Sequence, residues 1–252
     1  MSTPPDPPAP IRTHVARRAV SEFIGTALLV AIVVGSGVAA QTLSPHDTGL
    51  ALLENSIATA LGLGVLILAL GPVSGAHFNP VVSIAEAIET SRRPDRFTAR
   101  DVLVYALAQI LGAIAGAALA DAMFGVPVAI STTTRATGPH LLAEVVATAG
   151  LVLLIFALGR SGRGALAAPA VGAYIGAAYW FTSSTSFANP AVTLGRIFTD
   201  TFAGIAPASV LPFIGAQLVG GAVGLLAVRF LYPRPASSVS RDSEFRVTAS
   251  TS

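Results

Sequence analysis

The chain has 252 residues and a formal net charge of +2; 53% of its residues are hydrophobic and only 11% are charged. With a mean hydropathy of +0.71, this composition excludes a soluble globular domain and indicates an integral membrane protein. The chain has no cysteine, which excludes disulfides, thiolate metal ligands and cysteine nucleophiles. Its length allows about six membrane-spanning helices of ~20 residues each, because a hydrocarbon core is about 30 Å thick.

Six apolar segments of spanning length follow one another along the chain. The predicted spans are 19–41, 49–71, 99–123, 139–159, 165–183 and 208–231. The first could be a signal peptide, but its apolar stretch is longer than a signal peptide needs and further spans follow, so we predict a retained helix. Residues 1–15 and 233–252 are rich in proline, serine and other polar residues. We expect them to be disordered tails around a membrane domain of residues 16–232.

The arginines predict how these spans are oriented. All fifteen basic residues are arginine; thirteen fall at flanks that six spans place on one face, and only Arg135 and Arg196 fall on the other. The positive-inside rule therefore predicts that both termini are cytoplasmic. The pI near 9.5 reflects this topology signal rather than a nucleic-acid-binding face, because the arginines lie at helix ends. The exclusive use of arginine, with many alanines and glycines, suggests a bacterial inner-membrane protein.

Two segments between the spans carry an asparagine-proline pair, Asn79-Pro80-Val81 and Asn189-Pro190-Ala191. Proline fits the first turn of a helix and asparagine is a favoured cap, so each pair predicts the start of a short helix, over 81–90 and 191–200. A helix of that length crosses half of a membrane. Non-helical backbone at such a depth is tolerated only where it is buried in protein or lines a watery cavity.

The two halves of the chain repeat the same motifs. Glu22-x-x-x-Thr26 corresponds to Glu144-x-x-x-Thr148, and Ala108-Gln109 corresponds to Ala216-Gln217, with one Asn-Pro pair between these motifs in each half. Each half has three spans, an odd number, so the second half enters the membrane in the opposite orientation and the repeat is inverted. We therefore predict an all-α membrane protein with six transmembrane helices and two re-entrant half-helices that meet at the midplane of a pore.

This ordered set of motifs resembles the aquaporin and aquaglyceroporin family, the major intrinsic proteins, over residues 16–232. The resemblance rests on Ser74-Gly75-Ala76-His77-Phe78-Asn79-Pro80, its partner Asn189-Pro190-Ala191, both Glu-x-x-x-Thr motifs and Tyr105-x-x-Ala108-Gln109. It implies a passive channel in the lipid bilayer for small neutral solutes such as water, glycerol-type polyols and arsenous acid. It also implies a homotetramer without enzymatic activity or cofactor. Val81, Val192 and segment 181–187 are similar to a bacterial branch associated with arsenic resistance.

Four polar residues of the repeat have roles that the resemblance implies. Two half-helices that meet N-terminus to N-terminus each direct about +0.5 of an elementary charge at the midplane, which disfavours cations there. Asn79 and Asn189 would donate hydrogen bonds to a permeating solute; the alternative is that they only cap their helices. Glu22 and Glu144 would accept hydrogen bonds from the re-entrant backbone and support it; the alternative is a proton relay.

Three further features have simpler interpretations. We expect a structural hydrogen bond for His77, because the other histidines, at 14, 46 and 140, do not offer the spacing of a metal site. Glu54 has no counterpart in the second half, and it either faces a vestibule or reaches the membrane interface. Glycines four residues apart, at 112 and 116, 172 and 176, and 220 and 224, predict closely packed helices.

The family has a narrow constriction made of four positions, and spacing from the Asn-Pro pairs carries these onto Thr59, Ala177, Ser186 and Val192. The usual residue at the last position is arginine. Here it is valine, and the next arginine, Arg196, lies one turn further along the short helix. We therefore predict a wide, arginine-free selectivity filter; the alternative is that Arg196 reaches back and substitutes.

Two other functions compete with a channel. A coupled secondary transporter also uses inverted repeats and broken helices, but it needs an ion site or a titrating relay at the midplane, where this sequence offers asparagines and small residues. A membrane scaffold without transport is the third alternative. Solute flux without a driving ion separates a channel from both.

Overall fold

The computed structural model describes residues 14–233, and every regular element within that range is helical. Six helices are long and apolar enough to cross a membrane, which confirms the predicted number of spans and the fold class. They are α1 (Val15–Leu43), α2 (Thr48–Ser74), α4 (Ala99–Phe124), α5 (Gly138–Arg160), α6 (Ala167–Phe181, after a 3₁₀ turn at Gly164–Leu166) and α8 (Pro207–Leu231). The predicted tails, 1–15 and 233–252, lie almost wholly outside the described residues.

Local sequence signals set the ends of these helices. The side chain of Asp47 caps α2 by accepting a hydrogen bond from Leu50 N at 2.9 Å. Thr98 and Asp101 form a reciprocal capping box at the start of α4, which satisfies backbone N–H groups that have no partner within the helix. Gly75 ends α2 with a φ of +89°, a conformation that glycine adopts without a steric cost.

Two short helices lie between the spans. The first, α3 (Pro80–Thr90), has 11 residues, as its Asn-Pro pair predicts. The second, α7 (Pro190–Gly195), has 6 residues and passes into a 3₁₀ turn at Arg196–Phe198, so the predicted helix over 191–200 is too long. It ends early because Thr199 turns away with a φ of −136° and donates a hydrogen bond to Asp121 of α4 at 2.8 Å.

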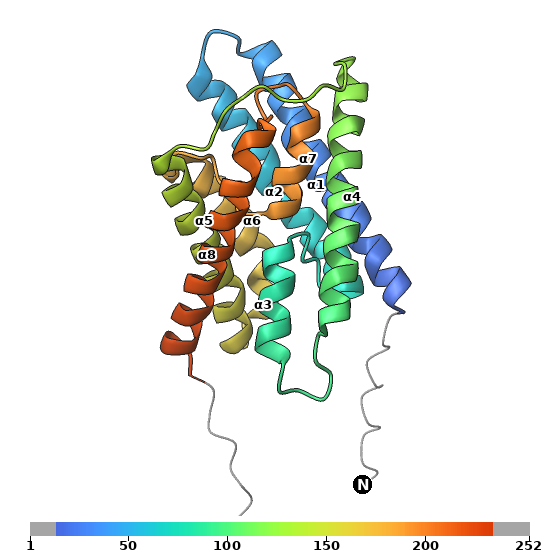
Figure 1. Cartoon of the computed structure of the whole chain (residues 1–252), viewed down its shortest axis with the longest axis vertical. Coiled ribbons are helices and arrows are strands. Elements are labelled where there is room, and N and C mark those ends of the chain that lie inside the picture. The colour runs from blue at the N-terminus through green and yellow to red at the C-terminus, as the bar shows by residue number, and fades with distance from the viewer. Residues whose placement is uncertain (1–13, 234–252) are drawn as a thin grey trace, which may run out of the picture.

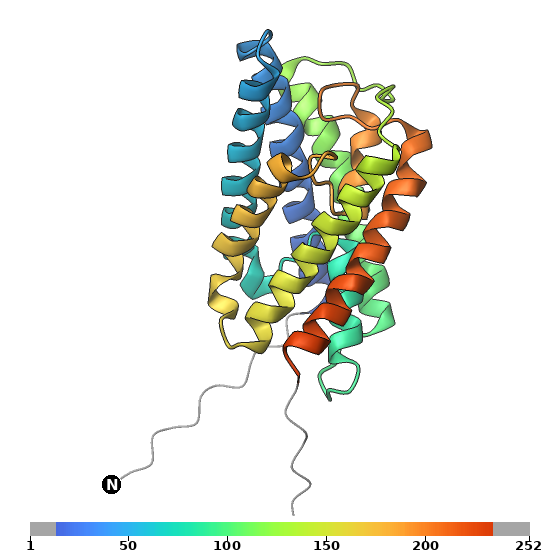
Figure 2. The ribbon, with the colours of Figure 1, turned by 90° about the vertical axis from the view of Figure 1, so that its left-hand side faces the viewer.

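The two halves of the chain form an inverted pair. α1 begins and α8 ends at the same end of the bundle (Figure 1), which we call the terminal end; the other is the opposite end. α3 lies on the terminal side and α7 on the opposite side, and the starts of the two helices meet inside the bundle. Figure 2 shows the long helices running alongside one another between the two ends. The chain is therefore built to cross a membrane several times with a half-helix entering from each side.

The long helices pack closely where the sequence has its glycine pairs. α1 lies along α4, and α5 lies along α8 in the corresponding place of the second half. A Cβ on Gly116 would lie 2.1 Å from Ala27 O, and a Cβ on Gly224 would lie 2.5 Å from Ala149 O. Only a residue without a side chain permits such an approach, which confirms the predicted packing role of these glycines.

Polar groups gather inside the bundle and apolar side chains gather outside. Glu22, Gln109, Glu144 and Gln217 are fully buried, whereas large apolar side chains such as Leu61 and Leu211 are 66% and 79% exposed. This distribution suits a protein whose solvent is lipid, because hydrocarbon accepts apolar surface and offers no partner to polar groups. The chain is a multi-pass membrane protein.

Candidate functional site

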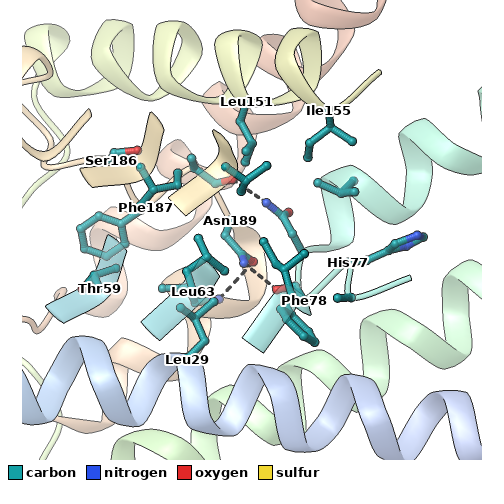
Figure 3. Close-up of a pocket in the computed structure, with 18 of the residues that line it drawn as sticks. Leu29, Thr59, Leu63, His77, Phe78, Leu151, Ile155, Ser186, Phe187 and Asn189 are labelled. Atoms are coloured by element: carbon teal, nitrogen blue, oxygen red, sulfur yellow. Dashed lines mark hydrogen bonds between the residues drawn. The ribbon is translucent and has the colours of Figure 1, made fainter. Parts of the chain in front are cut away.

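A cavity of about 330 Å³ passes along the line where the half-helices meet. Glu86 and Ala167 line it toward the terminal end, Asn79 and Asn189 line its middle, and Arg196 lines it toward the opposite end. Figure 3 shows Thr59 and Ser186 at one end of this cavity, His77 at the other and Asn189 between them. Much of the remaining wall is aliphatic: Leu29, Val33, Leu63, Ile67, Leu151, Ile155, Val171 and Ile175. The cavity is thus apolar with a few polar groups at fixed heights.

The side chains of the two asparagines form hydrogen bonds across the junction between the half-helices. Asn79 Oδ1 accepts a hydrogen bond from Val81 N at 2.9 Å, and Asn189 Oδ1 accepts one from Ala191 N at 2.9 Å. Each oxygen therefore caps its own helix, as predicted. Asn79 Nδ2 donates to the carbonyl of Ala188 at 2.7 Å.

The reciprocal bond completes the junction. Asn189 Nδ2 donates to the carbonyl of Phe78 at 2.6 Å (Figure 3). An amide nitrogen carries two hydrogens, so each of these bonds leaves one N–H of Asn79 and one of Asn189 for other partners. Both residues line the cavity. The asparagines are therefore more than helix caps, since they also join the two halves of the protein.

The turns before the half-helices have an unusual backbone. Ala76 and Phe78 have φ values of +50° and +49°, and Ser186 and Ala188 have φ values of +54° and +46° at the corresponding places of the second turn. Residues other than glycine rarely adopt this left-handed conformation, which costs roughly 1–3 kcal/mol each. Such turns persist only where surrounding contacts hold them.

Glu22 provides these contacts in the first half. Its Oε1 accepts hydrogen bonds from Ser74 Oγ at 2.6 Å and His77 N at 3.0 Å, and its Oε2 accepts from Phe78 N at 2.7 Å and Gln109 Nε2 at 2.8 Å. The carboxylate of α1 thus binds the first re-entrant turn and α4 at once. This is the arrangement that a support role requires.

Glu144 has the same set of partners in the second half. Its Oε1 accepts hydrogen bonds from Ser184 Oγ at 2.6 Å and Phe187 N at 2.9 Å, and its Oε2 accepts from Ala188 N at 2.8 Å and Gln217 Nε2 at 2.7 Å. The inverted repeat of the sequence is therefore reproduced bond by bond. Ser184 and Ser74 are members of this network that the sequence motifs alone did not assign.

His77 has both a structural contact and a place in the cavity wall. Its Nδ1 lies 3.0 Å from Ser83 Oγ of α3, and its ring packs against Phe97 and Tyr105 with centroids 5.3 Å and 5.2 Å away. The expected hydrogen bond is present, and the cavity position was not predicted. Within residues 14–233, no three histidine, aspartate or glutamate side chains come together as a metal site would need.

Glu54 lies away from the cavity wall. Its Oε1 accepts a hydrogen bond from Ser44 Oγ at 2.9 Å, close to where α1 gives way to α2. Ser44 follows the last residue of α1 at the opposite end of the bundle. Of the two interpretations of Glu54, a position near the end of its span at the membrane interface agrees with this contact.

Three of the four predicted filter residues line the cavity, and one does not. Thr59, Ser186 and Val192 are in its wall, but Ala177 is exposed on the outer face of α6. The inner face of α6 carries Ile175 and Tyr179 instead, because residues four apart share a helix face and the residue midway between them points away. Tyr179 OH lies 3.1 Å from Thr59 Oγ1 and occupies the side of the cavity that spacing had given to Ala177.

The cavity wall also contains an arginine outside the four predicted filter positions. Arg196 is in the cavity wall together with Val192 and is only 4% exposed. Its Nε donates to the carbonyl of Ala203, and its guanidinium carbon lies 3.6 Å from the ring centroid of Phe187. An arginine one turn beyond Val192 therefore lines the same cavity. Phe187, Tyr179 and Arg135 are residues of this region that sequence reasoning missed.

The chain is similar to known membrane channels over most of its length. A model of the major intrinsic protein family matches residues 11–186. The chain is 49% identical over 230 residues to aquaglyceroporin AqpS of Rhizobium meliloti strain 1021, covering 91% of this chain and 95% of that protein. It is 31% identical over 242 residues to aquaporin NIP2-2 of Zea mays, covering 93% and 79%.

A solved structure has the same fold. The aquaglyceroporin from Plasmodium falciparum superposes with a TM-score of 0.62 at 23% identity, covering 87% of this chain and 96% of that one. Six spans, two half-helices that meet at paired asparagines, and close relatives along nearly the whole chain lead to one conclusion: the chain belongs to the major intrinsic protein family.

Proposed function

We propose that this protein is a passive membrane channel for small neutral solutes: water, glycerol-type polyols and uncharged metalloid hydroxides such as arsenous acid. The observation that carries the proposal is the crossed pair of asparagines, Asn79 and Asn189, in the wall of a cavity of about 330 Å³. A relative that is 49% identical along 95% of its length bears the name aquaglyceroporin, which supports polyols as solutes.

The electrostatics of the midplane favour neutral solutes over cations. α3 and α7 both begin there, so the positive ends of two helix dipoles face each other. Each asparagine keeps one amide N–H that its hydrogen bond to the opposite turn does not use, and an N–H group stabilises the oxygen of a passing solute. A compact neutral molecule that has hydroxyl groups and an apolar body fits a wall of this mixed character.

A coupled transporter fits the contacts of Glu22 and Glu144 less well. Each carboxylate accepts four hydrogen bonds, two of them from the backbone of a left-handed turn. Carrying a proton through either group would release the turn that it holds. Transport driven by an ion would need a titrating group that is free to change its partners, so the support role and passive flux belong together.

The orientation and the assembly of the channel are further parts of the proposal. Nine of the eleven arginines in the described part of the chain belong to the flanks of the terminal end, which supports cytoplasmic termini in a bacterial inner membrane. The family resemblance supports a homotetramer in which each chain has its own pore. Cross-linking in native membranes and protease accessibility of the two termini test these two points.

Flux through purified protein in liposomes tests the proposal directly. Stopped-flow light scattering would measure water and glycerol permeation with no ion gradient present, and passive flux is the expected result. Leu63 lines the cavity, so Leu63→Trp places an indole ring in the pathway and should abolish flux. Leu61, two residues away, is 66% exposed on the outer face, and Leu61→Trp should leave flux unchanged. Flux that requires an ion gradient, or that is equal in both variants, would contradict the proposal.

A further inference from the structure

The only two arginines predicted for the opposite side of the membrane, Arg135 and Arg196, lie together around one aromatic ring. The guanidinium carbon of Arg196 is 3.6 Å from the ring centroid of Phe187, and that of Arg135 is 5.3 Å from the same centroid. Phe187 itself lines the cavity and belongs to the turn that Glu144 supports. The ring therefore stabilises two positive charges at the mouth of the cavity.

Three consecutive carbonyls hold the two guanidinium groups. Arg135 Nη2 donates to Phe202 O at 2.7 Å and Arg135 Nε donates to Gly204 O at 2.7 Å, while Arg196 Nε donates to Ala203 O between them. Arg135 lies in the connection between α4 and α5, and it binds two carbonyls of segment 199–206, which leads to α8. Arg196 binds the carbonyl between these two in the same segment.

The charge of Arg196 has no ion-pair partner in the described part of the chain. The ion pairs there are Arg18 with Asp101, and Glu89 with Arg160 and Arg229. No oxygen of Glu144 lies within ion-pairing distance of Arg196, and both of its carboxylate oxygens accept hydrogen bonds from other groups. Within residues 14–233, the hydrogen bonds of the Arg196 side chain use Nε alone, which leaves the four N–H donors of its two Nη groups for the cavity.

We propose that Arg196 is the group that binds solute hydroxyls and excludes cations at this mouth of the cavity, and that Arg135 positions it. The inference rests on the proposed channel function and names the selectivity element of that channel. A buried cation without an ion pair is costly to keep, and a position in the wall of a solute pathway gives its free donors partners. Its charge also repels other cations before they reach the midplane.

The direction of the short helix explains how Arg196 reaches this place. Side chains of a helix tilt toward its N-terminus, and the N-terminus of α7 lies at the midplane. Arg196 begins the 3₁₀ turn that directly follows α7, so the same tilt brings its long side chain to the cavity wall that Val192 also lines. Val192 is small enough to leave that space open, so a guanidinium one turn later occupies the wall that an arginine at position 192 would otherwise fill.

The surroundings of Arg196 indicate a solute with several hydroxyl groups. Ser186 Oγ is buried without a hydrogen-bond partner among the described residues and belongs to the same wall. The hydroxyls of Thr59 and Tyr179 lie there as well, while Val192 and the ring of Phe187 provide an apolar side. Guanidinium donors and hydroxyl groups facing apolar surface suit a neutral polyol or an uncharged metalloid hydroxide, whose hydroxyls bind one side and whose body contacts the other.

The test uses the full chain in liposomes, with Arg163→Ala as a matched control. Arg163 is exposed at the terminal end and its loss changes the net charge equally. We expect Arg196→Ala to raise potassium leak several-fold and to change the ratio of glycerol to water permeability, and Arg163→Ala to change neither. Arg196→Gln, which keeps N–H donors without the charge, should leak potassium and retain more of the parent's glycerol-to-water ratio.

Arg135 is tested through the positioning that it provides. Arg135→Ala should shift potassium leak in the same direction as Arg196→Ala, and the double variant should leak no more than Arg196→Ala alone. If the parent shows no passive flux at all, the proposed function fails first. If the parent conducts neutral solutes while Arg196→Ala and Arg196→Gln, both eluting as the parent does on size exclusion, match Arg163→Ala, the inference about Arg196 is overturned.

Discussion

Asn79 and Ala188 are joined by a hydrogen bond of 2.7 Å between the side-chain amide of one and the carbonyl of the other, although 109 residues separate them. The bond from Asn189 to Phe78 is its counterpart at 2.6 Å. Each half-helix is thus held by its own asparagine and by the asparagine of the other half. The midplane is therefore one cooperative unit, and a change in either turn is expected to affect both.

We expect Asn79→Ala and Asn189→Ala to destabilise the protein by similar amounts. Each change removes a helix cap worth about 1 kcal/mol and a crossed hydrogen bond worth about 1 kcal/mol. Thermal unfolding in detergent measures the effect, and the double variant should lose less than the sum because the two bonds support one junction. Additive losses would show instead that the two turns are independent.

Removing either supporting carboxylate should be more severe. Glu22→Ala and Glu144→Ala each leave two buried backbone N–H groups unsatisfied, at about 1–3 kcal/mol apiece, and release a turn that contains left-handed residues. Both variants should unfold at lower temperature and lose flux. Glu54→Ala is the control, because Glu54 binds Ser44 at the end of its span and should have a small effect. Parent-like flux in both Glu22→Ala and Glu144→Ala would rule out the support role.

The glycine contacts predict a position-dependent effect of one methyl group. Gly116→Ala should destabilise the bundle by about 1–3 kcal/mol, because its Cβ would lie 2.1 Å from Ala27 O and would push α1 away from α4. Gly215→Ala, in α8, meets no atom within 4 Å and should be neutral or slightly stabilising. Unfolding temperatures of the two variants compare them directly, and equal temperatures would refute the packing role.

The absence of cysteine from the sequence makes thiol reagents a clean probe of the cavity. The parent should be insensitive to mercurials. Val192→Cys places a thiol in the cavity wall and should make flux reversibly sensitive, whereas Leu61→Cys, on the exposed outer face, should not. Block of the cysteine-free parent by a thiol-specific reagent would count against passive flux through this cavity.

The sequence predicted those parts of the structure that depend on local signals or on the repeat. Hydropathy and span length gave the six helices, the Asn-Pro pairs gave both half-helix starts, and the matching motifs pointed to the symmetric roles of Glu22 and Glu144. These signals act within a segment or recur in both halves. They are visible without knowledge of how distant segments meet.

The differences lie where tertiary side-chain contacts, and not hydropathy or a repeated motif, decide the structure. Spacing carried a filter position onto Ala177, but the face of α6 that reaches the cavity carries Tyr179. The predicted range of α7 is too long because the chain turns away where Thr199 binds Asp121, 78 residues earlier. The position of Arg196 depends on the Ala203 carbonyl and the Phe187 ring, which are near in sequence but are brought into contact by turns that no motif indicates.

The last prediction concerns the space that Val192 leaves open beside Arg196. Val192→Arg would place a second guanidinium in a wall that already holds one, so it narrows the cavity and adds a like charge next to a buried cation. We expect glycerol and arsenous acid permeation to fall far more than water permeation, because water is small enough to pass a narrower opening. Stopped-flow measurements with each solute check this.

Combining Val192→Arg with Arg196→Ala separates the effect of side-chain size on permeation from the effect of positive charge. In the double variant Val192→Arg with Arg196→Ala, a single guanidinium is restored to the wall, one turn from its parent position. Potassium exclusion should return to the parent's level, because one fixed positive charge is again present in the cavity wall. Polyol permeation should stay below the parent's, because the new side chain begins nearer the midplane. If the double variant leaks potassium as Arg196→Ala does, the exclusion depends on the contacts of Arg196 with Phe187 and Ala203 rather than on a positive charge in the wall.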